Sequence, residues 1–401
     1  MELVEPEYMR DFSCLAGECP DTCCSGWDIV FDEAACGRYK NSPDEAVQRA
    51  FYQQVLRNEA PTADGAIPFA RVRLTKEQRC PFLCGDGLCF IQRRSEERNL
   101  SETCRTHPRV LRFWGQEYGE LSLQVSCPHA VDLILTDTPL SFFSTKIAAA
   151  DLRGLRSRRQ ENQRGIGFRN FIIHILQHRE YSLRERVLLA NHFFWQAAAF
   201  SDENDAGFLA LVDRYLEILA DGGKVRGIGE SAARQTAMSL EILRSLLLHR
   251  MHGIEMDAEL SGIGTWILQH GELQNQVTER SVFLYRQAQG TFSQFFQEQA
   301  QLLENYLVNQ VFKAGNLFLS GGGRQTWLLL VFQYALLQFL LLAAASQRGK
   351  AISSAKVRRI VQKLSKLVEH DERYLQQAVK FIEMLQLDNE MGMELLLREC
   401  G

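Results

Sequence analysis

The eleven cysteines of this 401-residue chain are crowded into one part of it. Ten of them precede residue 128, and the tightest group has the spacing Cys14-x4-Cys19-x3-Cys23-Cys24. The eleventh, Cys400, is one residue from the C-terminus and stands apart. Close thiol spacing of this kind is typical of metal sites. The thiol chemistry is therefore predicted to belong to the N-terminal third of the chain.

The sequence favours metal ligation over disulfide bonds. Residues 1–10 are acidic and polar and lack the apolar core and cleavage site of a secretory signal. We therefore expect a cytoplasmic protein, and in reducing cytoplasm clustered cysteines are more often metal ligands than disulfides. Four thiolates suit a tetrahedral zinc ion or a four-iron cluster, and spacing alone does not separate the two. Ten thiols are more than one such centre needs.

Local patterns single out individual thiols. Successive side chains of an extended chain point to opposite sides, so the adjacent Cys23 and Cys24 are not expected to bind the same centre. Ser101 precedes Cys104 by three residues, as a helix-capping hydroxyl does, and Cys127 directly precedes a proline that favours the first helical position. The positive end of a helix lowers a thiol's pKa and stabilises a metal–thiolate centre. Both thiols are therefore predicted ligands.

The pattern of apolar residues changes near residue 145. Before it the chain is mixed and rich in loops, with short strands predicted at 27–31, 67–74 and 121–125 and a helix capped by Asp32. From about residue 165 onward the pattern is helical, and Ser182-Leu-Arg-Glu185 is a capping box. Helices are predicted at 168–177, 182–200, 205–220, 230–251, 276–313, 325–346, 354–369, 371–386 and 389–399. We predict an α+β fold, predominantly α, with a small cysteine-rich metal-binding domain at 1–145 and an irregular all-helical domain at 146–401.

Three classes of protein are disfavoured. The net charge of −4 gives no reason to expect nucleic acid as a partner. No Gly-x-Gly pattern follows a predicted strand, so a Rossmann-type methyltransferase or dehydrogenase is not supported. The uncharged stretch 325–347 is long enough to span a bilayer. It contains Gln333 and Gln338 and lies among amphipathic helices, so we expect a buried core helix and no membrane span.

Short motifs in the N-terminal part, with two weaker ones in the helical part, carry a family resemblance. They are Phe12-Ser-Cys14, Glu18-Cys-Pro-Asp-Thr-Cys-Cys-Ser-Gly-Trp27, Cys80-Pro-Phe-Leu83, Gly87-Leu-Cys89-Phe-Ile91, Leu100-Ser-Glu-Thr-Cys-Arg105, Pro108-Arg109, Ser126-Cys-Pro128, Tyr181-Ser-Leu-Arg-Glu-Arg186 and Glu304-Asn-Tyr-Leu-Val-Asn309. Together they resemble the flagellin lysine-N-methylases, which share the cysteine-rich segment with a broader group of zinc- or iron-chelating proteins. The resemblance spans most of the chain, and the cysteine motifs are its specific part.

The resemblance implies an S-adenosylmethionine-dependent methyltransferase that N-methylates surface lysines of flagellin in the cytoplasm. It also implies an iron–sulfur cluster, with a 4Fe–4S cluster as the first expectation and zinc as the alternative. The family pattern selects eight thiols as metal ligands and leaves out Cys36 and Cys84. The eight are Cys14, Cys19, Cys23, Cys24, Cys80, Cys89, Cys104 and Cys127.

Fewer residues point to the S-adenosylmethionine site. Arg105 and Arg109 are candidate partners of the cofactor's carboxylate, and neutralisation of the thiolate centre is their alternative role. Trp27 is a candidate for stacking on the adenine or the sulfonium, and a place in the core is its alternative. The catalytic base is unknown. The unranked candidates for it are Glu117, Tyr118 and Asp132.

The chain departs from the family pattern at two places. His107 stands where the family has an aromatic residue, and residues 314–323 lack an expected Phe-Pro pair. The second departure puts the local geometry of the helical part in doubt, but not the cysteine site. A second class of function stays open at this stage: a zinc- or cluster-stabilised binding or redox protein of the flagellar system, without methyl transfer.

Overall fold

The computed structural model describes residues 1–26, 29–59, 69–95, 99–115, 117–147, 157–160, 164–200, 205–221, 233–253, 258–315 and 323–398. The chain divides into two compact units. The first unit comprises Met1–Leu133, Ser141–Glu161 and Ser365–Asp371, and the second comprises Ile134–Leu140, Asn162–Leu364 and Glu372–Gly401. The predicted α+β class with a predominance of helix is confirmed. The domain boundary at residue 145 stays a prediction.

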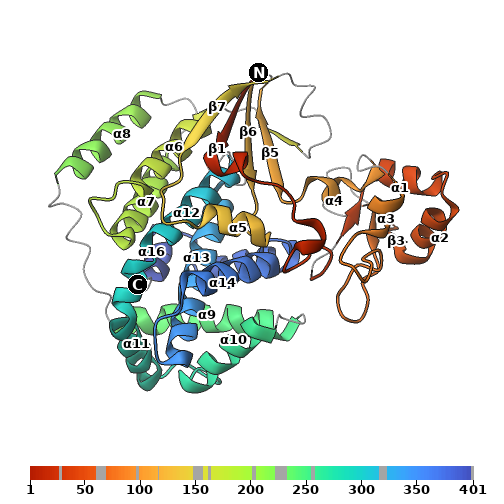
Figure 1. The fold of residues 1–401 in the computed structure, drawn as a ribbon. Helices are drawn as coiled ribbons and strands as arrows, with labels where there is room; N and C mark the ends of the chain where they lie inside the picture. The colour runs from red at the N-terminus through yellow and green to blue at the C-terminus, as the bar shows by residue number, and fades with distance from the viewer. Residues whose placement is uncertain are drawn as a thin grey trace. The chain divides into compact units, whose positions relative to one another are not determined.

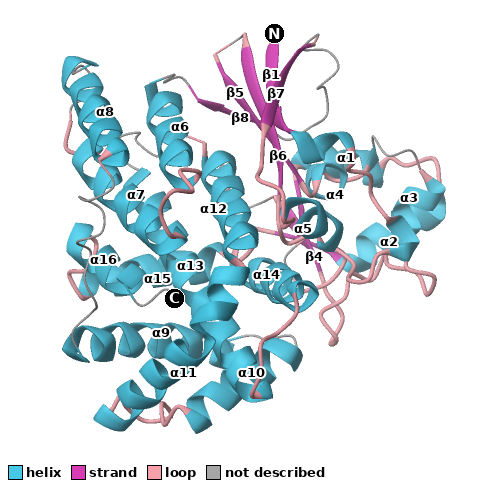
Figure 2. Cartoon of the chain, turned by 60° about the vertical axis from the view of Figure 1, so that its left-hand side comes forward, coloured by secondary structure: helices cyan, strands magenta, loops and turns pink. Residues whose placement is uncertain are grey.

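The larger sheet of the first unit is mixed and has the strand order β7-β1-β6-β5-β8. Its strands, magenta in Figure 2, are β1 (Glu2–Pro6), β5 (Arg109–Trp114), β6 (Tyr118–Leu123), β7 (Phe142–Lys146) and β8 (Ser157–Gln160). β1 is parallel to β6 and antiparallel to β7, so that Val4 lies between Glu120 and Ser144. β5 is antiparallel to β6 and parallel to β8. This arrangement differs from the doubly wound parallel sheet of a Rossmann fold.

A smaller antiparallel sheet of the first unit has the order β2-β4-β3. Its strands are β2 (Val30–Phe31), β3 (Val55–Arg57) and β4 (Ala70–Val72). The helices of this part of the chain are α1 (Glu33–Lys40), α2 (Glu45–Gln54), α3 (Phe90–Arg94), α4 (Glu102–Thr106) and α5 (Pro128–Ile134). The predicted cap of α1 is confirmed, because Asp32 Oδ1 accepts from the Ala35 N–H at 2.6 Å.

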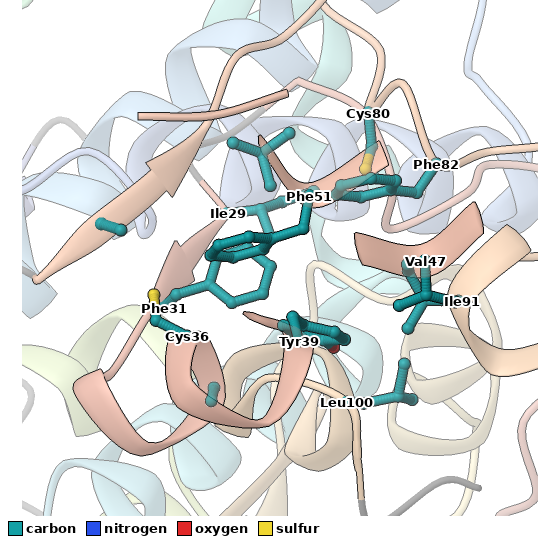
Figure 3. Close-up of a cluster of buried hydrophobic side chains, with 13 residues drawn as sticks. Ile29, Phe31, Cys36, Tyr39, Val47, Phe51, Cys80, Phe82, Ile91 and Leu100 are labelled. Carbon is teal, nitrogen blue, oxygen red and sulfur yellow. The ribbon is translucent and has the colours of Figure 1, made fainter. Parts of the chain in front are cut away.

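One hydrophobic cluster joins the smaller sheet to α1, α2 and the loops that carry cysteines (Figure 3). The rings of Phe31 and Phe51 contact Tyr39 with centroid distances of 5.3 and 5.6 Å. Cys80 enters the cluster from the loop before α3, whereas Cys36 of α1 lies well away from Cys80 in Figure 3. Both thiols therefore belong to the cluster, but they lie at separate places in it.

The second unit is helical (Figure 1). Its helices are α6 (Arg164–Leu176), α7 (Leu183–Ala197), α8 (Asp205–Ala220), α9 (Ala233–Gly253), α10 (Ala258–His270), α11 (Glu279–Glu298), α12 (Ala300–Ala314), α13 (Gly323–Arg348), α14 (Ser354–Val368), α15 (Glu372–Met384) and α16 (Glu390–Arg398). The last residues of α14, from Ser365, belong to the first unit. The capping box predicted at Ser182 is confirmed by its reciprocal bonds with Glu185.

Helix α13 is the core element of the second unit. It packs against α9, α10, α11, α12, α15 and α16, and each residue from Val331 to Ala345 is buried. Among the described residues it is the one helix long and apolar enough to cross a membrane, and 89% of its most apolar stretch is buried inside the structure. Gln338 Nε2 donates to the Tyr334 hydroxyl at 2.7 Å, so this amide N–H is satisfied within the helix. These observations favour the core-helix interpretation.

Two helix predictions were wrong. Helix α10 was missed, because Gly262 and Gly264 weaken the helical signal by about 1 kcal/mol each. Packing of α10 against α9 and α13 compensates for that weakness. The single helix predicted at 276–313 is two helices, α11 and α12, which meet at Gln299 without a proline or glycine.

Candidate metal centre

Cys24 and Cys80 lie opposite each other on two adjacent stretches of chain. The Cys80 N–H donates to the Cys24 carbonyl at 2.8 Å, and the next pair, Ser25 and Arg79, forms an antiparallel bridge. Cys80 is buried in the hydrophobic cluster, and Cys24 packs against the same cluster. The backbone pairing therefore holds these two thiols in one neighbourhood.

Cys89 reaches that neighbourhood from the end of the loop that carries Cys80, and Cys104 reaches it from another segment. A bridge between Leu83 and Cys89 folds the loop before α3 back on itself, and Cys89 packs against the cluster. Cys104 lies in the first turn of α4, where its N–H donates to Ser101 Oγ at 3.3 Å. Tyr39 lies beside both, because its hydroxyl hydrogen-bonds with the Ser101 backbone and its pKa is raised by burial and by the charges of Cys104 and Cys89. We call Cys24, Cys80, Cys89 and Cys104 the inner thiols.

The inner thiols act on one another electrostatically. Burial, together with the charges of the other three inner thiols, raises the pKa of Cys80 to about 12. The surrounding protein likewise raises the pKa of Cys104 to about 12, with added contributions from Cys24 and Cys89, although the residue is exposed in part. Like charges disfavour one another only at short range, so this coupling agrees with the backbone geometry.

The other four predicted ligands are called the outer thiols: Cys14, Cys19, Cys23 and Cys127. The Phe12 ring stacks on His129 with a centroid distance of 5.7 Å, which brings the chain before Cys14 against the start of α5. Cys127 directly precedes α5. Burial raises the pKa of Cys127, and the charges of Cys19 and Cys14 add to the effect. Cys14, Cys19 and Cys127 therefore share a second neighbourhood.

The adjacent Cys23 and Cys24 differ in environment. Cys23 is exposed, whereas Cys24 is half-buried and packs against the cluster. The Cys23 thiol donates a hydrogen bond to Cys24, which lowers the pKa of Cys24 and raises that of Cys23. The charge of Cys14 acts on Cys23, and that of Cys104 acts on it as well. The two thiols are thus hydrogen-bonded to each other, but only Cys24 packs against the hydrophobic cluster.

Both helix starts predicted beside thiols are present, at α4 and α5. The N–H groups of Ala130 and His129 lower the pKa of Cys127, and the Ser101 hydroxyl lowers that of Cys104. The predicted lowering by the helix ends is therefore present, but both pKa values are raised overall. Removing water from a thiolate outweighs the partial charge of the helix end at both positions.

The donor set fits a thiolate-bound metal centre. In the described ranges, no three His, Cys, Asp or Glu side chains converge closely enough to hold a metal ion. Arg105 Nε, next to Cys104 in sequence, is buried and has no hydrogen-bond partner among the described residues. A buried guanidinium N–H beside thiols suits a centre of net negative charge, such as four thiolates around a zinc ion or a 4Fe–4S cluster.

The remaining predicted site residues have different surroundings. Trp27 lies outside the described residues. The Arg109 guanidinium lies over the Phe12 ring, 5.0 Å from its centroid, close to the outer thiols. Among the candidate bases, the Tyr118 hydroxyl donates to Glu120 Oε1 at 3.1 Å, while Glu117 and Asp132 are exposed. These contacts and exposures do not rank one candidate base above the other two.

A lysine far away in the sequence was missed as part of the site. Lys366 Nζ donates to Asp21 Oδ1 at 2.7 Å and to the Thr22 carbonyl at 2.9 Å, and it lies 3.4 Å from Ser25 Oγ. Its side chain is only 13% exposed. The segment 365–371 makes a second contact through His370 Nε2, 2.8 Å from Ser126 Oγ. The segment 365–371 therefore contacts the chain at residues 21–25 and at Ser126, next to thiols in both places. No sequence pattern predicts these contacts.

Replacing Lys366 with methionine is expected to loosen the segment 19–26. The change keeps most of the apolar stem and removes a nearly buried charge that makes two short hydrogen bonds, which costs about 1–3 kcal/mol. Hydrogen exchange of the amides in 19–26, followed by mass spectrometry, should accelerate about tenfold for each 1.4 kcal/mol lost.

Lys363→Met is the matched control for this prediction. Lys363 lies one helical turn earlier on α14 and pairs with Glu259 in the second unit. Exchange in 19–26 should be unchanged in Lys363→Met. Equal acceleration in the two variants would show that α14 stability, and not the contacts of Lys366, controls the loop.

The first unit contains a cavity of about 420 Å³. Tyr39 forms part of its wall, together with Arg38, Asn41, Ser42 and Ser95. The Arg38 guanidinium donates to the Leu100 carbonyl at 3.3 Å, while its Nε is buried without a hydrogen-bond partner among the described residues. The volume is within the range of small-molecule sites, about 300–1,000 Å³, and the guanidinium suits a carboxylate.

The chain is similar to known proteins along nearly its whole length. Residues 169–396 match the FliB lysine N-methylase C-terminal domain. The chain is 23% identical over 428 residues to the lysine-N-methylases of Salmonella choleraesuis (strain SC-B67) and Salmonella typhimurium (strain LT2), and each match covers 98% of both proteins. It is 29% identical over 138 residues to the flagellar biosynthetic protein FliU of Salmonella muenchen, which covers 34% of this chain and 78% of the relative. No solved structure matches the chain. Because the matched domain covers more than half of the sequence, the chain belongs to the FliB lysine N-methylase family.

Proposed function

We propose that this protein is a cytoplasmic, S-adenosylmethionine-dependent methyltransferase that N-methylates surface lysines of flagellin, with an iron–sulfur cluster bound by its N-terminal cysteines. The observation that carries the methyltransferase assignment is the end-to-end similarity to two lysine-N-methylases, at 98% coverage of both proteins. The flagellar name of a third relative supports a flagellar protein substrate. The inner and outer thiols support the cluster through their donor chemistry.

Lysine methylation requires a neutral amine. Lowering a lysine pKa from about 10.4 to 7 costs roughly 4–5 kcal/mol, at about 1.36 kcal/mol per unit. The chain must supply this through a base, an apolar channel or nearby positive charge, and must also align the amine with the sulfonium methyl group. When bound, S-adenosylmethionine supplies the methyl group. A cluster would either stabilise the fold or, with one iron not bound by a thiolate, bind the cofactor's amino and carboxylate groups.

We place the S-adenosylmethionine site in the first unit. Arg105 is the strongest candidate for the cofactor's carboxylate, because its Nε is buried beside Cys104 and has no partner among the described residues. Arg109 is a second candidate at the outer thiols, and Trp27 remains a candidate for stacking. The cavity beside Tyr39 offers a further carboxylate partner in Arg38.

The test is a methyl-transfer assay with the full-length chain. The protein is purified without oxygen, its iron, zinc and sulfide are measured, and it is incubated with flagellin and S-adenosylmethionine carrying a labelled methyl group. Mass spectrometry should find label on flagellin lysines, and flagellin with acetylated lysines should take up none. Unlabelled flagellin in the presence of folded, metal-loaded protein would contradict the proposed activity. Stoichiometric zinc without iron would contradict the cluster.

A further inference from the structure

The eight predicted ligands separate by backbone position and packing into two sets of four. We infer that the chain holds two metal centres: an inner centre bound by Cys24, Cys80, Cys89 and Cys104, and an outer centre bound by Cys14, Cys19, Cys23 and Cys127. Either centre can be a zinc ion or an iron–sulfur cluster, because four thiolates complete the coordination of both. The inference rests on the metal-binding part of the proposed function and is independent of methyl transfer.

The inner set is defined by backbone contacts. Cys24 and Cys80 are paired across a 2.8 Å hydrogen bond, and the bridge between Leu83 and Cys89 places Cys89 at the end of the same loop. Cys24, Cys80 and Cys89 all contact one hydrophobic cluster, which also contains Leu100. Leu100 immediately precedes the cap of α4, so Cys104 enters from that side. Three segments thus deliver the four thiols, and the loop before α3 carries both Cys80 and Cys89.

The outer set surrounds the start of α5. The stacking of Phe12 on His129 holds the first loop against α5, so that Cys14 is near Cys127. Cys19 is fixed by its own short turn, in which Sγ donates to the Asp21 carbonyl at 3.2 Å. Lys366 holds Asp21 and Thr22, the residues between Cys19 and Cys23. The same loop therefore supplies three outer thiols, and Cys127 is the fourth.

The adjacent cysteines are divided between the two sets. Cys24 packs on the cluster and pairs with Cys80, whereas Cys23 is exposed and is not part of the cluster packing. A tetrahedral centre needs its ligands at separate corners, and the side chains of neighbouring residues diverge. Closing either centre requires its thiols to move closer together, because among the described residues no three converge closely enough to hold a metal ion. The Cys23 thiol must in addition release its hydrogen bond to Cys24.

Two cysteines lie outside both sets. Cys36 is buried on α1 and lies apart from Cys80 in Figure 3, and burial raises its pKa to about 11. Cys84 is half-buried, and its N–H donates to the Leu88 carbonyl at 2.8 Å within the loop. Each set already has four thiols without them. Cys84 therefore provides a control cysteine in the same loop as two inner ligands.

The test compares serine substitutions of two neighbouring residues in the full-length chain. Cys24→Ser should lose the metal of the inner centre and keep that of the outer one, and Cys23→Ser should do the reverse. Cys89→Ser should match Cys24→Ser, Cys127→Ser should match Cys23→Ser, and the double variant C89S/C127S should lose both metals. Cys84→Ser should keep the full metal content.

The readouts are metal and sulfide content per chain and the X-ray absorption or Mössbauer spectrum of each variant, all measured without flagellin. Circular dichroism of the helical unit identifies any variant that fails to fold. A C89S/C127S variant that loses no more metal than Cys89→Ser alone, in folded protein, would overturn the division. So would a wild-type chain with metal for only one four-thiolate centre. Loss of methyl transfer with both centres intact would refute the proposed activity and leave the two centres standing.

Discussion

Replacing Glu304 with alanine is expected to destabilise the second unit by about 3–5 kcal/mol. The Glu304 side chain is 1% exposed and accepts from Arg186 Nη1 at 2.6 Å and from Arg179 Nε at 3.1 Å. Arg186 is itself only 5% exposed. Removing the carboxylate leaves this buried guanidinium uncompensated, and that cost is larger than the net contribution of the intact pair.

Hydrogen exchange of α7 and α12 peptides measures this effect within the second unit, where a two-state analysis of the whole chain does not apply. A loss of 3–5 kcal/mol accelerates exchange from the most protected amides by about 10²- to nearly 10⁴-fold. Glu394→Ala is the control, because Glu394 pairs with Arg398 one turn away on α16 at a half-exposed site. Its expected cost is about 0.3–0.5 kcal/mol. Similar losses in both variants would show that burial of Glu304 does not set its contribution.

Replacing Phe339 with alanine is expected to cost about 3–5 kcal/mol, because the ring is fully buried at the centre of α13. Its centroid lies 6.0 Å from that of Tyr285 on α11, so the cavity left behind would be enclosed by helices of the same unit. Because most of the helices belong to the second unit, loss of the helical circular-dichroism signal on heating reports on that unit, and its midpoint should fall by about 2–4 °C for each kcal/mol lost.

Phe283→Ala is the matched control for this prediction, since Phe283 on α11 is 55% exposed. It should change the midpoint by only a small fraction of the Phe339→Ala shift. The comparison also tests the role of α13. A Phe339→Ala variant as stable as Phe283→Ala would contradict the view that α13 is the packed core of the second unit.

Features that depend on a few neighbouring residues were predictable. The caps at Asp32, Ser101 and Ser182 are confirmed, because a hydroxyl or carboxylate directly before the helix accepts from a free N–H three residues further on. The helix start after Cys127 is confirmed as well, with Pro128 as its first residue. The net direction of the thiol pKa values was not predictable, because the protein that surrounds Cys104 and Cys127 and removes water from them comes from residues far away in sequence.

Features that depend on distant contacts were missed. Strand β1 is flanked by β6 and β7, more than a hundred residues away, and such pairing leaves no mark on residues 2–6 beyond ordinary strand propensity. The break at Gln299 is buried and is held by Ser354 Oγ, 3.1 Å from Gln299 Oε1. Lys366 lies on an amphipathic helix, and the sequence pattern of that helix does not distinguish this lysine from the others on it.

By itself the sequence determined that this protein has a thiol-rich N-terminal part, a helical remainder and the motifs of a lysine-methylase family. These follow from residue types and short spacings. Only the tertiary structure decided which thiols are neighbours, because Cys24 and Cys80 meet through backbone pairing at a separation of 56 positions. It also decided that Lys366 binds Asp21, which lies 345 residues earlier in the chain. Contacts of that range come from the packing of the whole chain, and no local pattern encodes them.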